Sequence, residues 1–187
     1  MEKIERTRTR MEGLRASGRI TLRDLQSVYE ALFLRGVTSF EVFLESLFMA
    51  ILRQKVRYPK SRVSLRMTAA NDKALLEILQ QNQAYLQWIP YSHTESRAKL
   101  YLNEGKPFSE LTGGDKSIVK TITTIRNAIA HSGSHAKAEF ERTVIGSRAL
   151  LRGERTPAGF LRTAANPTQK RFEVYMVELS RIAAGLS

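Results

Sequence analysis

A single stretch of helical periodicity, from Leu22 to Val56, sets the strongest limit on how this chain can fold. Apolar residues recur there at intervals of three and four, which places them along one side of an α-helix. A continuous helix of about 35 residues would reach roughly 50 Å, and Gly36 within it is a point where it can kink or let another backbone approach closely. Thr21 is the expected N-cap, and Pro59 is expected to end the helix, because proline disfavours helical backbone at the residue before it. A broad, Phe-rich stripe of this kind is typical of a helix in the core of a bundle.

The other segments follow the same period. Helices are expected over 2–17, from Asn71 or Asp72 to Ile89, over 95–102, 114–131 and 136–144, and after Thr168 as N-cap, with a polar turn over 91–96 and a basic loop over 146–167. No segment alternates convincingly for more than a few residues, so strands are expected to be few or absent. The sequence therefore predicts an all-α, single-domain helical bundle of about five to seven helices over residues 20–187. A basic N-terminal helix or arm, 1–19, precedes it.

The charge of the chain is strongly positive. Its 187 residues include 30 Lys and Arg against 18 Asp and Glu, a formal net charge of +12. This excess favours an anionic partner, above all nucleic acid, over the alternative of a protein that merely happens to be basic.

Several classes of protein are disfavoured by what the sequence lacks. Without cysteine, the chain has no disulfides and no thiolate metal sites. No apolar run reaches the roughly 18 residues of a membrane span, and the charged N-terminus does not resemble a signal peptide. A cytoplasmic protein with no membrane partner is expected.

The segment 114–133 resembles one complete helix. Asp115 is its expected N-cap, and Ser132-Gly133 its expected stop, because glycine accepts the left-handed backbone that follows many helices. One apolar stripe is formed by Ile118, Ile122, Ile125 and Ile129.

Arg126, Asn127 and His131 gather at the C-terminal end of this segment. Asn127 and His131 share a face, whereas Arg126 lies roughly 140° around from His131 on an ideal helix. Histidine exchanges protons near neutral pH, and a helix C-terminus favours its imidazolium form. Arginine can hold a phosphate or stabilise a phosphorane, and asparagine can donate to a phosphate oxygen or fix the imidazole tautomer. The group suits metal-independent RNA cleavage with the 2′-hydroxyl as nucleophile; the alternative is a plain helix cap.

Other chemistries fit less well. Thr112-Gly113-Gly114-Asp115-Lys116-Ser117 lacks the glycine that a phosphate-binding P-loop requires five residues before its lysine. The chain has three histidines and no His-x-x-His or Glu-x-x-His spacing, so neither metal nor cofactor is expected. His93 is interpreted as an exposed polar residue, and His135 as the start of the next helix.

Two further groups have more than one interpretation. The first is a run of arginines that forms either a solvated face or an RNA-backbone patch, and the net charge favours the patch: Arg142, Arg148, Arg152, Arg155 and Arg162. The second is aromatic: Tyr85, Trp88 and Tyr101 can stack on bases, but packing in a core or an interface is favoured.

The stretch Arg126-Asn127-Ala128-Ile129-Ala130-His131 resembles the Arg-x(4–6)-His motif of HEPN domains, in which a polar residue, often Asn, follows the Arg. The order of a long early helix, a motif helix and a final helix is most similar to the RiboL-PSP branch of that family. The resemblance covers about residues 20–185, and its specific part is the motif.

This resemblance implies an all-α domain that dimerises and places two motifs in one cleft. Many such domains are metal-independent endoribonucleases of toxin–antitoxin or other defence systems, and some are inactive. By resemblance, Arg126 and His131 are the catalytic pair, Asn127 supports them, and the expected partners are RNA, a second copy, and an antitoxin or other defence-system protein. The alternative is a non-catalytic HEPN-like RNA-binding or adaptor module.

Overall fold

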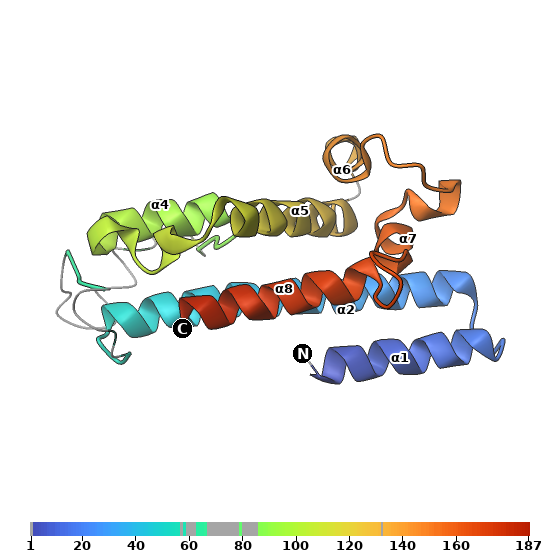
Figure 1. Ribbon diagram of the computed structural model, residues 1–187, viewed down its shortest axis with the longest axis horizontal. Coiled ribbons are helices and arrows are strands. Elements are labelled where there is room, and N and C mark those ends of the chain that lie inside the picture. The colour runs from blue at the N-terminus through green and yellow to red at the C-terminus, as the bar shows by residue number, and fades with distance from the viewer. Residues whose placement is uncertain (1, 57, 59–62, 67–78, 80–85, 132) are drawn as a thin grey trace. The chain divides into compact units, whose positions relative to one another are not determined.

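The computed structural model describes residues 2–56, 58, 63–66, 79, 86–131 and 133–187 (Figure 1). The α-helices of this part are α1 (Glu2–Ala16), α2 (Leu22–Leu52), α4 (Tyr91–Tyr101), α5 (Gly113–Ala130), α6 (Ser134–Phe140), α7 (Pro157–Arg162) and α8 (Arg171–Leu186). These residues form no β-strand, only isolated bridges between Leu65 and Leu102 and between Ala164 and Lys170. The all-α prediction is confirmed. No helix in the described part is long and apolar enough to cross a bilayer.

The long predicted helix is present as α2, and Thr21 caps it as expected. The Asp24 N–H donates to the Thr21 hydroxyl over 3.1 Å, and the Thr21 N–H donates back to the Asp24 carboxylate over 2.9 Å. The helix ends at Leu52, earlier than expected. Gln54 there adopts a left-handed φ of 55°, and its N–H bonds the Ile51 carbonyl over 2.9 Å. This left-handed residue closes the helix before Pro59, which lies outside the described residues.

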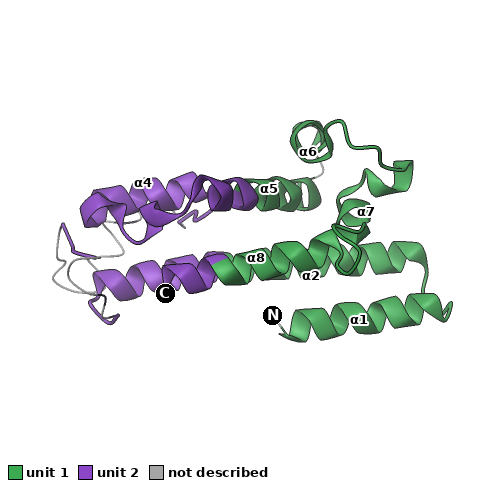
Figure 2. Ribbon diagram, in the orientation of Figure 1, with its two compact units in different colours: residues 1–40, 120–181 green, residues 41–119, 182–187 purple. Residues whose placement is uncertain are grey.

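The chain divides into two compact units, shown in Figure 2. Unit 1 contains residues 1–40 and 120–181, and unit 2 contains residues 41–119 and 182–187. Helices α1, α6 and α7 belong to unit 1 and α4 to unit 2, whereas α2, α5 and α8 contribute residues to both. The basic N-terminal segment is thus a helix within unit 1.

An aromatic cluster forms the core of unit 1. The ring of Phe172 in α8 lies 5.3 Å from that of Tyr29 and 6.3 Å from that of Phe33, both in α2. All three side chains are fully buried. Gly36 lies within the continuous helix α2 and lets α8 approach closely, because a Cβ added there would overlap the Met176 sulfur.

Helix α1 is held in unit 1 mainly by polar contacts. Ile4 is its one buried apolar side chain, and Arg8 beside it is only 7% exposed. The Arg8 guanidinium bonds Glu5, Glu173 of α8 and, over 3.3 Å, the Tyr29 hydroxyl.

A second set of contacts extends this network by one turn of α1. Tyr29 donates its hydroxyl to Glu12 over 2.6 Å, and Glu12 also accepts from Lys170, just before α8. Arg8 and Glu12 therefore tie α1 to both helices of the aromatic core.

Unit 2 is built around Phe48 of α2. Its ring lies 5.3 Å from Trp88, 6.3 Å from Tyr101 and 5.5 Å from Phe108. Trp88 and Tyr101 are 2% and 6% exposed, so both pack in a core and neither is available to stack on a base. Tyr85, and most of the helix expected to end at Ile89, lie outside the described residues, and residues 86–89 are not helical.

Several helix starts differ from the sequence prediction, and α6 begins at Ser134 where 136 was expected. Helix α4 begins at Tyr91, inside the expected turn, because Pro90 acts as N-cap and the Thr94 hydroxyl bonds the Trp88 carbonyl over 2.6 Å. Helix α7 lies in the expected loop, where Thr156 caps it by accepting from the Gly159 N–H over 3.1 Å.

Helix α8 begins at Arg171 and not directly after Thr168. The Glu173 carboxylate fixes this start by accepting the Lys170 N–H over 2.6 Å.

Glu12 provides a test of the network around α1. Burial alone would raise the pKa of Glu12, but hydrogen bonds from Lys170 and Tyr29 outweigh it and hold that pKa below its usual 4.5. A depressed carboxylate pKa contributes stability above the unfolded value, and this contribution is lost as pH falls through the folded value. We expect Glu12→Gln to lower the free energy of unfolding by about 1–3 kcal/mol at about pH 7, as measured by urea denaturation.

The matched control is Glu2→Gln, an exposed carboxylate on the same helix. The deficit of Glu12→Gln should shrink as pH falls below 4.5, where the wild-type carboxyl also becomes protonated. A deficit that stays constant with pH would contradict an ionic role for Glu12.

Candidate active site

Helix α5 carries the predicted motif on a well-defined scaffold. Thr112 is its N-cap, and not Asp115 as the sequence suggested: the Asp115 N–H donates to the Thr112 hydroxyl over 3.1 Å. The Asp115 carboxylate in turn accepts the Thr112 N–H over 3.2 Å. Farther along, Ile122 and Ile125 are 1% and 0% exposed, so the expected stripe anchors the part of α5 that precedes the motif.

The C-terminal end of α5 differs from its expected form. The helix ends at Ala130, so His131 is the first residue beyond it, exposed, with its N–H still bonded to the Asn127 carbonyl over 2.9 Å. Gly133 has φ −63° and ψ 148° and serves as N-cap of α6, so the expected left-handed glycine stop is wrong. The chain passes into α6 through extended backbone at Gly133, and Ser132 lies outside the described residues.

A cavity of about 320 Å³ lies between the end of α5 and α6. Its walls are formed by Thr124, Asn127, His131, Gly133, His135, Ala136 and Glu139. The α5 residues in this set, Thr124, Asn127 and His131, are spaced three and four apart and so follow one face of the helix. The structure thus brings Asn127 and His131, which the sequence placed on one helix face, to one cavity.

Arg126 does not line this cavity but bonds Asn127, which does. It is half-buried, is not among the residues that line the cavity, and donates from Nη1 to the Asn127 Oδ1 over 3.2 Å. With its oxygen occupied in this way, the Asn127 amide keeps its N–H groups for a ligand in the cavity. Asn127 therefore bonds Arg126 at its side-chain oxygen and lines the same cavity as His131.

His135 is the cavity residue that the sequence analysis set aside. It is exposed, in the first turn of α6, and it shares the cavity with His131. Two signals could have pointed to it: His135 and Glu139 are four residues apart on one helix face, and only residues 131–133 separate α5 from α6. The cavity therefore offers two imidazoles for proton transfer.

Within the described residues, no group of three or more His, Cys, Asp or Glu side chains is arranged to hold a metal ion. Glu139 in the cavity wall is instead paired with Arg142, whose Nη2 lies 2.5 Å from its carboxylate.

The five predicted RNA-binding arginines do not share one surface role. Arg142 and Arg155 pair with Glu139 and Glu141, and Arg148 donates to the carbonyls that end the π-helical turn Glu141–Ile145. Arg162 lies with its guanidinium 5.9 Å from the Tyr29 ring centre and its Nε 3.8 Å from Glu12. Arg152 is exposed. Four of the five arginines thus have a partner within the chain, while the paired Arg142 side chain stays 72% exposed to solvent.

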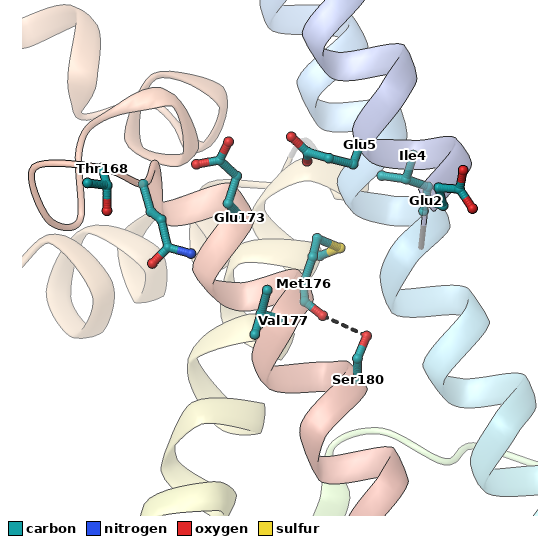
Figure 3. Close-up of a pocket in the computed structure, with 9 residues that line it drawn as sticks. Glu2, Ile4, Glu5, Thr168, Glu173, Met176, Val177 and Ser180 are labelled. Atoms are coloured by element: carbon teal, nitrogen blue, oxygen red, sulfur yellow. Dashed lines mark hydrogen bonds between the residues drawn. The ribbon is translucent and has the colours of Figure 1, made fainter.

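Unit 1 contains a larger cavity, of about 430 Å³, between α1 and α8 (Figure 3). Its lining combines the apolar side chains Ile4, Met176 and Val177 with the carboxylates Glu2, Glu5 and Glu173. It contains no histidine, and two of its carboxylates bond Arg8. The cavity beside His131 is therefore the better candidate for phosphate chemistry, although it is smaller.

Comparison of the chain with protein-family models, with curated proteins and with solved structures gives no match. The HEPN resemblance stays a prediction, which depends on the motif from Arg126 to His131 and on the order of the helices.

The shared cavity makes a prediction about the chain's three histidines. Uridine 3′-monophosphate should shift the imidazole NMR signals of His131 and His135 together, because a phosphate bound beside Asn127 lies against both. His93, exposed on α4, is the internal control and should stay unchanged. Equal shifts at all three histidines, or a shift at His93 alone, would contradict a ligand site in this cavity.

Proposed function

We propose that this chain is a metal-independent endoribonuclease of the HEPN type that acts on RNA in the cytoplasm. The observation that supports it best is the cavity at the end of α5, lined by Asn127, His131 and His135, with Arg126 bonded to the Asn127 amide. An acid, a base and a fixed cation near one phosphate are the groups that RNA cleavage by its own 2′-hydroxyl requires.

In the proposed reaction the RNA supplies its own nucleophile. His135 takes the proton of the 2′-hydroxyl as its oxygen attacks the adjacent phosphorus. The bond from phosphorus to the 5′-oxygen breaks, and His131 gives that oxygen a proton, leaving a 2′,3′-cyclic phosphate and a 5′-hydroxyl.

Arg126 and Asn127 act on the charge that develops at phosphorus. A guanidinium is charged at every pH of interest, so Arg126 stabilises the phosphorane without taking part in proton transfer. The Asn127 amide, held at its oxygen by Arg126, donates to a phosphate oxygen.

The proposal includes a homodimer with both motifs in one cleft, and a protein partner such as an antitoxin within a defence system. The exposure of the two histidines supports the proposed dimer, because His131 and His135 lie at the surface, where a second copy can complete the site. Arg126, which lies behind Asn127 in its own chain, can then serve a phosphate shared between two motifs.

Substitution of the two histidines tests the reaction. We expect His131→Ala and His135→Ala each to slow RNA cleavage in EDTA by about 100-fold or more, the typical contribution of a general acid or base. His93→Ala is the matched control and should keep the wild-type rate. Replacing the 2′-hydroxyl at the cleaved linkage with hydrogen should abolish cutting by the wild type.

The pH dependence of RNA cleavage makes the test specific to the two histidines. Wild type should give a bell-shaped rate profile, and each His→Ala variant should lose one limb of it. Equal cutting by wild type and His131→Ala would refute the catalytic assignment. RNA that binds the cavity and is never cut would instead favour a non-catalytic RNA-binding module.

Dimerisation makes a separate prediction. Sedimentation at micromolar concentration should give a dimer, and cleavage per chain should fall on dilution below the dissociation constant. A monomer that cleaves RNA at constant specific activity would show that each cavity works alone.

A further inference from the structure

The outer face of α1 carries three cations in a row: Lys3, Arg6 and Arg10. They are exposed, and their spacing of three and four residues places them within about 60° of one another around the helix. Ile4 and Arg8, the buried residues of α1, lie roughly on the opposite side. We call these three residues the α1 basic stripe.

The three cations of the α1 basic stripe have no ion-pair partner in the described part of the chain. None of its three side-chain cations forms a hydrogen bond or an ion pair there. Among the nearby acids, Glu5 bonds Arg8 and Glu12 bonds Lys170, while Glu2, four residues before Arg6, forms no ion pair with the stripe in the described part of the chain. Like charges four residues apart, as in Arg6 and Arg10, disfavour a helix, so folding alone gives no reason for this pattern.

The opposite face of α1 holds the stripe in a fixed orientation. With Ile4 as its one buried apolar side chain, α1 depends on the Arg8 and Glu12 networks for its position. These networks attach α1 to α2 and to the start of α8, which leaves Lys3, Arg6 and Arg10 facing solvent. The N-terminal segment is thus an ordered basic surface.

The stripe also differs from the arginines of residues 142–162. Those side chains mostly bond carboxylates or carbonyls of their own chain, as Arg142 does with Glu139. The solvent-accessible positive charge of unit 1 therefore includes the α1 basic stripe. This stripe lies outside the arginine patch of residues 142–162 that the sequence favoured. A stripe roughly 10 Å long can contact successive phosphates of a nucleic-acid strand.

We propose that the α1 basic stripe binds the RNA phosphate backbone independently of base sequence. The choice of RNA rests on the proposed function, whereas the need for a polyanion rests on the stripe itself. Phosphate contacts from Lys and Arg position a strand without reading its bases. An anionic membrane fits less well, because α1 has no exposed large apolar residue that would enter a lipid interface.

The test measures RNA binding with cleavage switched off. In a His131→Ala background, the variant Lys3→Gln, Arg6→Gln, Arg10→Gln is titrated with a fluorescein-labelled single-stranded RNA by polarisation. We expect binding to weaken about 10-fold or more at about 100 mM KCl, and the salt dependence of log Kd to lose a slope of about 2, as for three phosphate contacts on a single strand.

A charge-matched control separates the stripe from overall charge. Arg35→Gln, Lys55→Gln, Lys120→Gln removes the same charge from exposed positions outside α1. This control should bind RNA within about twofold of its parent, which is little more than the effect of long-range attraction. Equal weakening by both variants, or no weakening by the stripe variant, would overturn the proposal.

Two further readouts complete the test. Circular dichroism should show the same helix content and melting for both variants; if the stripe variant fails to fold, Arg6→Gln alone is used, with loss of one phosphate contact expected. Binding of vesicles of phosphatidylserine and phosphatidylcholine that is stronger than RNA binding, and lost in the stripe variant, would overturn RNA as the ligand. Because the background is inactive, weakened binding supports the stripe even if wild type cleaves nothing.

Discussion

Tyr29 joins the two kinds of interaction on which unit 1 depends. Its ring packs against Phe172 in the aromatic core, and its hydroxyl accepts from Arg8 and donates to Glu12. Burial, reinforced by the hydrogen bond to Glu12, raises the pKa of Tyr29, so the hydroxyl stays protonated and continues to donate. One side chain thus connects a polar N-terminal helix to an apolar core. A helix with so little apolar surface would otherwise have few contacts to keep it there.

The candidate site depends instead on the position at which helix α5 ends. In the apolar stripe of α5, Ile122 and Ile125 are buried, and the functional side chains begin directly after them with Arg126. The packed part of α5 fixes where the helix ends, and the chain then turns into α6 to enclose the cavity. Arg126 and His131 lie awkwardly for direct contact on one helix, and the Asn127 amide between them resolves this: it bonds Arg126 at its oxygen and lines the cavity with His131.

Much of the fold could be predicted because helical periodicity is a local signal. The long stripe after Thr21 and the stripe of α5 both survive in the structure, since each buries most or the central part of its apolar residues, Ile122 and Ile125 in α5. The ends were harder to predict, because they depend on single hydrogen bonds: Gln54 ends α2 with backbone that usually favours glycine, and Thr112 rather than Asp115 caps α5. The motif was found from its residue types, but His135 was missed, because only the fold shows that α6 closes the cavity. The same limit applies to the arginines: net charge pointed to Arg155, and only the contacts show that Glu141 neutralises it.

The cavity beside His131 is assembled entirely from residues 124–139. Its contact order is therefore low: no strand pairing or long loop has to close before its walls meet, only one short connection between neighbouring helices. Such a segment can form early, as two neighbouring helices with one short connection, before elements far apart in the sequence pack together. It also means that the chemistry of the site is contained in one continuous stretch of sequence. That stretch can therefore change by local substitution on the side of the helices that lines the cavity.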